Sequence, residues 1–358
     1  MNILLNMEKE DFEQIVFCQD KETNLKAIIA IHSTFLGPAL GGLRMFPYPT
    51  EEEALEDVLK LAIGMTYKNS AAGVNLGGGK AVIIGDPKKD KTKEMLVAFS
   101  KYVNSLNGRY ITAEDSGTTV EDMDIILQHT PFVVGSSASL GKSGDPAPFT
   151  AYGVYVGIKL VVEKVLGKSS LEGLTIAVQG AGNVSYNLCP YFLREGAKVV
   201  VSDVREEAVL KFLNAFKVSY VDPEKIYDVK CDVFVPCALG GILNIDTVKR
   251  LDCSIVAGCA NNQLKDDIIC ELIEKKGIFY VPDFIINAGG LINVSFELEG
   301  YDKQKALKKI KETIYKNILE ILDLIFKTGI TSNEAAKRIA LKRLKKSKVK
   351  KEKEILGT

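Results

Sequence analysis

The chain has 358 residues, 46% of them apolar, and its 46 basic and 46 acidic side chains give a formal net charge of zero. This length suits two domains, and the apolar fraction is ordinary for a globular protein. A neutral chain presents no global field to nucleic acid or to an anionic membrane, and no apolar run approaches the ~20 residues of a membrane span. We therefore expect neither a nucleic-acid partner nor a membrane location.

The cysteines and histidines argue against a metal centre. Seven cysteines are scattered along the chain without a CxxC pair, and there are only two histidines. Such cysteines are typical of a reduced protein with buried thiols. The N-terminal apolar patch is too short for the core of a secretory signal, and acidic residues follow it. We expect a cytoplasmic protein that holds no metal.

Strands and helices alternate in the first part of the chain, which predicts an α/β domain with a mixed sheet. Residues 37–42 and the triple glycine at 77–79 predict loops, because glycine weakens strands and helices but permits a close approach to the backbone. Lys80 would then stand at the mouth of a strand, beside a gap for a small molecule. The predicted strands are 25–32, 82–84 and 109–113, and the predicted helices follow Thr50, lie near 91–104 and follow Thr119.

A Ser-, Gly- and Pro-rich stretch at 136–150 is a candidate hinge. A second α/β series begins near residue 174, and its continuous apolar strands are typical of a parallel sheet covered on both faces. A long helix is expected at 302–327, and another helix follows Ser332. The lysine-rich tail predicts a solvated end, with polyanion binding as the alternative.

A glycine motif in the second series predicts dinucleotide binding. The turn is Gly180-Ala181-Gly182-Asn183-Val184-Ser185, which lies between a predicted strand and a predicted helix. Asp203 ends the next strand, 23 residues after Gly180, near the offset of an acid that binds the adenosine ribose. The glycines let a pyrophosphate approach the helix N-terminus, which favours anions. Asp203 favours NAD, while nearby Arg205 leaves NADP open.

Lys68, Lys80 and Asp115 are the candidates for acid–base chemistry. An unperturbed lysine has a pKa of ~10.4 and is no base at neutral pH. A second ammonium group and burial both lower the pKa of a lysine. One lysine would hold a substrate carboxylate and the other would move protons, with Asp115 relaying a second proton. The alternatives are solvated surface charges for the lysines and a turn role for Asp115.

Eight segments of the chain resemble the glutamate/leucine/phenylalanine/valine dehydrogenase family, most closely its leucine-specific branch. The resemblance covers residues 25–340 or so and implies a substrate domain at 1–135, a Rossmann NAD-binding domain at 136–329, and C-terminal helices at 330–358 that return to the first domain. The active site would lie between them. The segments are GPALGGLRM (37–45), GMTYKNSAAGVNLGGGKAVIIGDP (64–87), NGRYITAEDSGTT (107–119), TAYGVY (150–155), AVQGAGNV (177–184), CDVFVPCALG (231–240), AGCANNQL (257–264) and PDFIINAGGLINV (282–294).

The resemblance implies NAD-dependent, reversible oxidative deamination of an L-amino acid to a 2-oxo acid and ammonia, by a homo-oligomer for which an octamer is favoured. Lys80 resembles the lysine that activates water, Asp115 the proton-transfer aspartate, and Lys68 the lysine that binds the substrate carboxylate. The remaining implied positions are Gly41, Gly42 and Asn262 at the substrate, Thr150 and Asn261 at the nicotinamide, residues 180–184 and Asp203 at the pyrophosphate and ribose, and Cys237, Ala238 and Leu239 beside the adenosine.

The positions that resemble the family's side-chain pocket are all apolar: Leu40, Ala113, Leu291 and Val294. Burying a carboxylate among them would be costly, so glutamate is disfavoured and a branched aliphatic side chain fits. One methylene is worth only ~1–3 kcal/mol in such a pocket, so leucine, valine and isoleucine are not ranked and phenylalanine stays open.

Three positions depart from the leucine-specific pattern, namely Gly79, Ser185 and Asp145. The first two replace one small residue by another, whereas Asp145 adds a charge near the expected hinge. Two other classes stay open. A 2-hydroxy-acid dehydrogenase would usually need a histidine in a motif, and a non-catalytic NAD- or amino-acid-sensing protein would not need Lys80.

Overall fold

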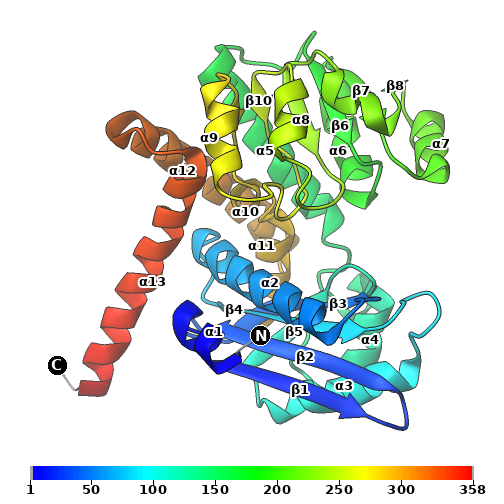
Figure 1. The fold of residues 1–358 in the computed structure, drawn as a ribbon, viewed down its shortest axis with the longest axis vertical. Coiled ribbons are helices and arrows are strands. Elements are labelled where there is room, and N and C mark those ends of the chain that lie inside the picture. Colours follow the sequence, from blue (N-terminus) through cyan, green and yellow to red (C-terminus); the bar gives the residue numbers. More distant parts are fainter. Residues whose placement is uncertain (1–2, 357–358) are drawn as a thin grey trace. The chain divides into compact units, whose positions relative to one another are not determined.

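The computed structural model describes residues 3–356, with side chains up to residue 347. These residues form two compact units (Figure 1). Unit 1 comprises the described residues up to Asp145, Val294–Lys303 and the described residues from Ala340 onward, and unit 2 comprises Pro146–Asn293 and Gln304–Ile339. The domain boundaries expected at 135 and 329 stay a prediction. In the described part of the chain, no helix is long and apolar enough to cross a membrane.

Unit 1 is built on a mixed five-stranded sheet in the order β1-β2-β4-β3-β5. β2 pairs antiparallel with both β1 and β4, whereas β3 runs parallel to both β4 and β5. The strands are β1 (Gln14–Asp20), β2 (Leu25–Ser33), β3 (Ala39–Phe46), β4 (Gly77–Ile84) and β5 (Tyr110–Glu114). This confirms the mixed sheet expected for the first domain.

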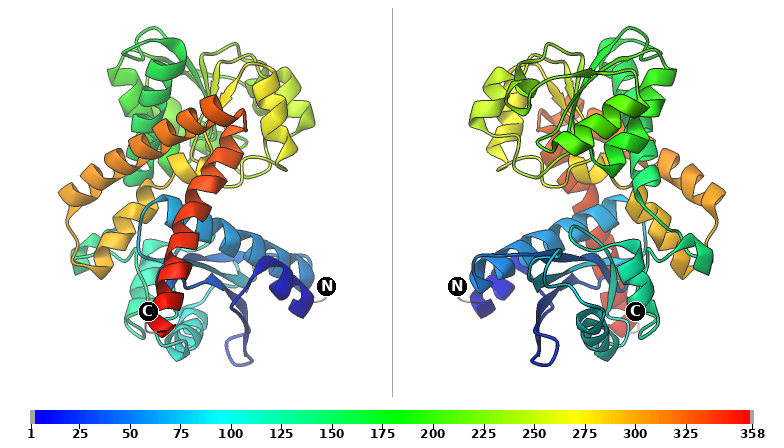
Figure 2. Two further views of the ribbon diagram at one scale, coloured as in Figure 1. Left: turned by 90° about the vertical axis from the view of Figure 1, so that its left-hand side faces the viewer. Right: turned by 90° about the vertical axis from the view of Figure 1, so that its right-hand side faces the viewer.

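Helices cover both faces of this sheet (Figures 1 and 2). α2 packs on the face that carries Ile28, Ala30 and Val82, and α3 and α4 pack on the face that carries Ile29 and Ile31. Because β2 is buried on both sides, it is apolar at consecutive positions rather than at alternate ones. The helices are α1 (Ile3–Glu10), α2 (Glu51–Ala71), α3 (Lys93–Ser105) and α4 (Val120–Leu127).

Two expected loops are strands. β3 already includes residues 39–42, and β4 begins at Gly77 rather than after the glycines. None of the three glycines at 77–79 has a positive φ, so the close approach of neighbours, not backbone conformation, requires them. A Cβ on Gly78 would overlap Thr66 of α2, and a Cβ on Gly79 would lie 3.0 Å from the Ala30 carbonyl oxygen.

Unit 2 is a parallel six-stranded sheet in the order β11-β10-β9-β6-β7-β8. The chain starts in the centre, moves outward to β8, and returns through β9 to β11, which is the doubly wound order of a Rossmann fold. Its strands are β6 (Thr175–Gln179), β7 (Lys198–Ser202), β8 (Ser219–Tyr220), β9 (Val233–Pro236), β10 (Ile255–Val256) and β11 (Phe279–Tyr280). β8 does not follow the pattern of continuous apolar strands, because its two residues are exposed.

The helices of unit 2 lie mainly between these strands. The first of them, α5, begins at Ala147 and ends at Leu166, where it is capped by Gly167, whose φ is +66°. α8 and α9 pack on one face of the sheet, through Val248 and Ile269. The elements are α5 (Ala147–Leu166), α6 (Asn183–Arg194), α7 (Glu206–Ala215), η2 (Pro223–Asp228), α8 (Ile245–Arg250), α9 (Ile268–Lys275), α10 (Asp283–Ile286) and α11 (Gly289–Ser295).

The C-terminal part of the chain returns to unit 1. After η3 (Phe296–Leu298) and α12 (Lys303–Thr328), helix α13 (Ser332–Leu356) begins in unit 2 and continues into unit 1. The Ser70 hydroxyl donates to the Ala340 carbonyl at 2.7 Å, and Arg343 donates to the Val74 carbonyl at 2.6 Å. These contacts confirm the expected return of the C-terminal helices. The lysine-rich tail is helical up to Leu356.

The stretch expected to be a hinge crosses the boundary between the units, at Asp145 and Pro146. It contains the short helix η1 (Ala138–Leu140). One carboxylate oxygen of Glu297 accepts bonds from the backbone of Gly135 at 2.9 Å, from the backbone of Ser143 at 3.0 Å, and from the Ser143 hydroxyl. Glu297 therefore holds the part of the stretch in unit 1; hinge motion stays a prediction.

Candidate active site

The centre of the candidate site is an ion pair between Lys80 on β4 and Asp115 just after β5. The Lys80 Nζ lies 2.9 Å from the Asp115 Oδ2, and the two side chains are 6% and 16% exposed. β3 separates their two strands in the sheet. The predicted catalytic pair is therefore brought into direct contact, although its members are 35 positions apart in the sequence.

Gly42 of β3 is the reason that the two side chains can meet. A Cβ on Gly42 would stand 3.2 Å from the Lys80 Nζ and 2.8 Å from the Asp115 Cβ. The distance to the backbone oxygen of Glu114 would be 2.7 Å. A side chain at this position would occupy the space through which the ion pair crosses the central strand, so the sheet needs glycine here.

A tight turn fixes the backbone of Asp115. The Asp115 N–H donates to the Thr118 Oγ1 at 3.0 Å, and that buried hydroxyl lies 2.8 Å from the Leu43 carbonyl of β3. Gly117 has a φ of +86°, and a Cβ there would strike the Met45 carbonyl. The turn is thus packed directly on the strand whose glycine admits the ion pair.

Burial and neighbouring charges set the protonation of this pair. Burial lowers the pKa of Lys80, the carboxylate of Asp115 opposes that shift, and the charge of Arg44 adds to it. Burial alone would raise the pKa of Asp115, but the positive charges of Lys80 and Arg44 bring it down to about 2. The site therefore holds an ionised aspartate next to a lysine that loses its proton more easily than usual.

Arg44 is the charged group of this site that is absent from the predicted residues. Its Nε donates to the same Asp115 oxygen at 2.9 Å. The expected source of a lowered lysine pKa is Lys68, whereas the cation that contributes to the shift at Lys80 is Arg44. The sequence indicates this position indirectly. Arg44 follows Gly42 by two positions, and alternate residues of a strand lie on the same face of the sheet.

Lys68 lies in the last turn of α2 and is half-buried. Its neighbour Asn69 is buried, and its side-chain amide donates to the Leu40 carbonyl at 3.3 Å and to the Gly77 carbonyl. These bonds attach the end of α2 to β3 and β4. The helix turn that carries the predicted carboxylate-binding lysine is therefore held against the strands that carry Gly42 and Lys80.

The residues predicted for the side-chain pocket belong to both units. Leu40 and Val294 of unit 1 are buried and Ala113 is half-buried, and Leu291 of unit 2 is buried. Val294 lies beside the end of β5, because a Cβ on Gly135 would be 3.9 Å from the Val294 Cγ1 and 4.0 Å from the Glu114 nitrogen. All four side chains are apolar, as the sequence requires.

Glu114 is a second acid next to Asp115, with one carboxylate oxygen buried and without a hydrogen-bond partner. Burial, together with the negative charges of Asp145 and Asp115, raises the pKa of Glu114 to about 7. Asp145 thus acts on a neighbour of the ion pair in addition to lying near the expected hinge.

In unit 2, the glycine turn follows β6 and opens α6, at the point where the strand order reverses. Gly180 has a φ of +107°, and a Cβ there would lie 2.8 Å from the Ala238 nitrogen. A Cβ on Gly182 would meet no protein atom within 4 Å. Gly180 is therefore needed by the fold itself, whereas Gly182 leaves open space at the N-terminus of a twelve-residue helix.

Asp203 lies at the end of β7 and bonds to the same turn. One of its oxygens accepts the Ala181 N–H at 2.8 Å. The other accepts the backbone N–H of Arg205 at 2.8 Å and its Nε at 3.1 Å. Burial alone would raise the pKa of Asp203, but the bonds from Arg205 and Ala181 lower it. Asp203 is thus an ionised acceptor with Arg205 beside it.

The other predicted cofactor residues come from two loops and α5. Cys237, Ala238 and Leu239 follow β9, and the Cys237 N–H donates to the Gln179 carbonyl of β6 at 2.7 Å. Thr150 of α5 faces α11, since a Cβ on Gly290 would lie 2.6 Å from the Thr150 hydroxyl.

Asn287 is a residue of this region that the sequence motifs do not single out. Its buried side-chain amide donates to the Asn261 side-chain oxygen at 2.9 Å and to the Cys259 carbonyl at 3.0 Å. The next residue along the loop, Asn262, has a φ of +52°, which asparagine tolerates better than most residues. Asn287 therefore fixes the loop that carries both predicted asparagines.

These features fit a dinucleotide. The turn at Gly180 and Gly182 gives a backbone that a pyrophosphate can approach, α6 offers a helix N-terminus, and Asp203 stands at the end of the next strand. Among the described residues, no group of histidine, cysteine and carboxylate side chains could hold a metal ion. A Rossmann unit with this turn, together with a buried lysine–aspartate pair in a second α/β unit, defines a nucleotide-dependent dehydrogenase.

Comparison with known proteins gives the family. Residues 12–132 match the dimerisation domain of the Glu/Leu/Phe/Val dehydrogenases, and residues 201–351 match the glutamate/leucine/phenylalanine/valine dehydrogenase model. The chain belongs to this family and is an amino acid dehydrogenase. Membership implies a nicotinamide cofactor and an amino acid substrate.

Relatives extend over nearly the whole chain. It is 55% identical over 344 residues to a leucine dehydrogenase of Thermoactinomyces intermedius, covering 96% of this chain and 94% of that protein. It is 48% identical over 341 residues to a phenylalanine dehydrogenase of Caldalkalibacillus thermarum, covering 94% and 92%. The crystal structure of L-tryptophan dehydrogenase from Nostoc punctiforme matches with a TM-score of 0.79 at 44% identity, covering 97% and 99% of the two chains.

Proposed function

We propose that this protein catalyses the NAD-dependent, reversible oxidative deamination of branched-chain L-amino acids, with leucine as the principal substrate. The observation that carries the proposal is the buried Lys80–Asp115 pair, which supplies an easily deprotonated amine and an ionised carboxylate side by side. The 55% identity with a leucine dehydrogenase supports the choice of substrate.

Each residue of the site has a proposed role. The half-buried ammonium group of Lys68 binds the substrate α-carboxylate. Lys80 removes a proton from water as that water adds to the iminium carbon of the oxidised substrate. Asp115 moves protons at the substrate nitrogen, which leaves as ammonia. The bound nicotinamide supplies the hydride chemistry at Cα.

The backbone and loop residues have proposed binding roles. Gly41 and Gly42 line the substrate, with Asn262 close to it. Thr150 and Asn261 hold the nicotinamide, the turn from Gly180 to Val184 takes the pyrophosphate, and Cys237, Ala238 and Leu239 flank the adenosine. Asp203 accepts the bond from the ribose 2′-hydroxyl and repels a 2′-phosphate, which favours NAD over NADP.

The pocket wall supports an aliphatic substrate. Leu40, Ala113, Leu291 and Val294 offer no polar group to a substrate side chain, so a charged one would lose its hydration without compensation. Valine and isoleucine fit the same chemistry. Phenylalanine is the second candidate, because relatives at 48% identity include a phenylalanine dehydrogenase. A substrate panel ranks them.

We also propose that the protein works as a homo-oligomer in the cytoplasm. Support comes from residues 12–132, which match a domain described as a dimerisation domain, and from the general preference for closed symmetric assemblies. Light scattering coupled to gel filtration tests this and measures the number of subunits, for which eight is the favoured value.

The decisive assay is NADH oxidation with 4-methyl-2-oxopentanoate, with and without ammonium. Turnover that depends on ammonium and disappears in Lys80→Ala is expected. Turnover without ammonium would indicate a hydroxy-acid dehydrogenase. Tight NADH binding without turnover on any 2-oxo acid would indicate a sensing protein and would refute the proposal.

A further inference from the structure

Asp115 shares one carboxylate oxygen between two cations. Lys80 Nζ and Arg44 Nε both lie 2.9 Å from the Asp115 Oδ2. They approach from different strands, β4 and β3. The proposed reaction changes the protonation of Lys80, so only the bond from Arg44 is independent of that change. An arginine stays protonated at all working pH values.

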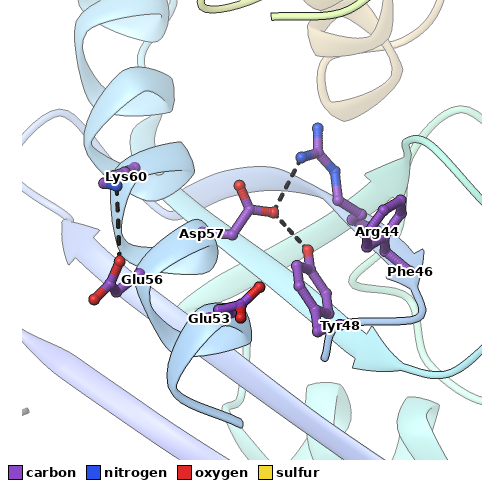
Figure 3. Close-up of a pocket in the computed structure, with 7 residues that line it drawn as sticks. All are labelled: Arg44, Phe46, Tyr48, Glu53, Glu56, Asp57 and Lys60. Atoms are coloured by element: carbon purple, nitrogen blue, oxygen red, sulfur yellow. Dashed lines mark hydrogen bonds and ion pairs between the residues drawn. The ribbon is translucent and has the colours of Figure 1, made fainter. Parts of the chain in front are cut away.

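Arg44 is in turn held at its other end. Its Nη1 lies 3.0 Å from the Asp57 Oδ2, and the Tyr48 hydroxyl donates to the same oxygen at 2.5 Å (Figure 3). Asp57 belongs to α2, and Tyr48 follows β3. The five side chains Lys80, Asp115, Arg44, Asp57 and Tyr48 thus form one continuous network within unit 1.

The geometry needs arginine rather than any cation. Arg44 uses Nε for Asp115 and Nη1 for Asp57, so the two carboxylates bind different edges of one planar group. A lysine has a single flexible ammonium group and would not hold both carboxylates in the same fixed relation. The charges of the network also act on the pKa of Lys80. They are the carboxylates of Asp115 and Asp57 and the guanidinium group of Arg44.

We propose that Arg44, anchored by Asp57 and Tyr48, is the positioning residue of the proton-transfer pair: it holds the Asp115 carboxylate in place beside Lys80 while the pair exchanges protons with the substrate. This inference rests on the proposed function. The inference gives a role to a depression of about 350 Å³ beside α2, which is lined by Arg44, Asp57 and Tyr48. There the anchoring side chains reach the surface, away from the ion pair itself.

The test compares Arg44→Gln, Arg44→Lys and Asp57→Asn with the wild type in full pH profiles of kcat for oxidative deamination. Arg44 contributes to the lowered pKa of Lys80, so Arg44→Gln should move the rising limb of the profile to higher pH, by about one unit. Arg44→Lys keeps the positive charge but loses the planar group that binds both carboxylates. This variant should leave the pH of the rising limb unchanged and lower kcat by about 10- to 100-fold.

Asp57→Asn tests the anchor without touching Asp115. It should lower kcat while leaving the KM for NAD unchanged, since Arg44 loses its second ionic contact. Glu56→Gln is the matched control, because Glu56 precedes Asp57 on the same helix and its only described ion pair is the exposed one with Lys60, at 3.9 Å. This control should behave as the wild type.

Two results separate the inference from the proposed function. If the wild type shows no ammonium-dependent turnover with any 2-oxo acid, the proposed function fails. If the wild type is active, and folded Arg44→Gln and Asp57→Asn keep its kcat and pH profile, the positioning role is refuted. Should Arg44→Gln not fold, Asp57→Asn and Arg44→Lys still decide the matter.

Discussion

The replacement Gly42→Ala is the most direct test of how the sheet assembles the ion pair. The added methyl group would lie 2.8 Å from the Asp115 Cβ and 2.7 Å from the Glu114 carbonyl oxygen. Carbon atoms in contact prefer about 3.5–4.0 Å, so Asp115 must move by roughly 1 Å. A misplacement of this size costs about 100-fold in rate. The free energy of unfolding should fall by about 1–3 kcal/mol, as for other overpacked sites.

The assay measures kcat for both directions of the reaction, NADH affinity by fluorescence, and unfolding by heat or urea. We expect kcat to fall about 100-fold while NADH affinity is retained, because the dinucleotide residues lie in unit 2. Gly64→Ala is the control: a Cβ on this helical glycine meets nothing within 4 Å. If folded Gly42→Ala has the kcat of the wild type, the central strand does not need glycine for the ion pair and the reasoning is wrong.

Three further predictions concern the cofactor and the base. Gly182→Ala should fold normally, because the added methyl group meets no protein atom within 4 Å, but should lose NADH affinity if the pyrophosphate lies there as proposed, whereas Gly180→Ala should also lower thermal stability. Arg205→Ala should free the acceptor oxygens of Asp203 and raise the ratio of kcat/KM for NAD to that for NADP, and an unchanged ratio would show that Arg205 takes no part in the choice. Burial lowers the pKa of Lys80. If its neutral amine is the base, as proposed, kcat for deamination should rise with pH through that lowered pKa, and Lys80→Ala should remove both this rise and the turnover.

The parts of the fold that follow from local pattern could be predicted from the sequence. The helices expected after Thr119 and Thr50 begin there: Thr119 and Asp122 form a reciprocal cap of α4, and Thr50 accepts the Glu53 N–H at the start of α2. The parallel sheet of unit 2 also follows from its continuous apolar strands. These features depend on contacts between residues close in sequence or on burial alone, which composition reveals.

β3 and the first part of β4 could not be predicted, because their evidence lies in tertiary packing. Gly41 and Gly42 disfavour a strand by intrinsic propensity. In the sheet, however, a Cβ on Gly41 would overlap the Gly79 carbonyl, while the Tyr110 hydroxyl donates to the Gly41 carbonyl at 2.6 Å. Close contacts across strands thus override the local preference, and only the fold shows which strands are neighbours.

The roles of Arg44 and Asn287 were hidden for a related reason. Neither belongs to a motif with its own chemistry, and each acts through another side chain: Arg44 through Asp115, and Asn287 through Asn261. Sequence spacing can indicate a residue that contacts a ligand. It rarely indicates a residue that positions such a side chain, because the positioning depends on a bond between residues far apart in the sequence.

The triple glycine shows how packing and chemistry are linked in this site. Gly78 and Lys80 alternate on β4 and so share the face that α2 covers. A Cβ on Gly78 would overlap backbone atoms of Thr66, two residues before Lys68. The missing side chain therefore lets the last turns of α2 lie directly on β4. The glycine run does not make an empty space for ligands; it sets the height of the helix turn that bears Lys68 above the strand that bears Lys80, and thereby fixes the proposed carboxylate anchor relative to the proposed base.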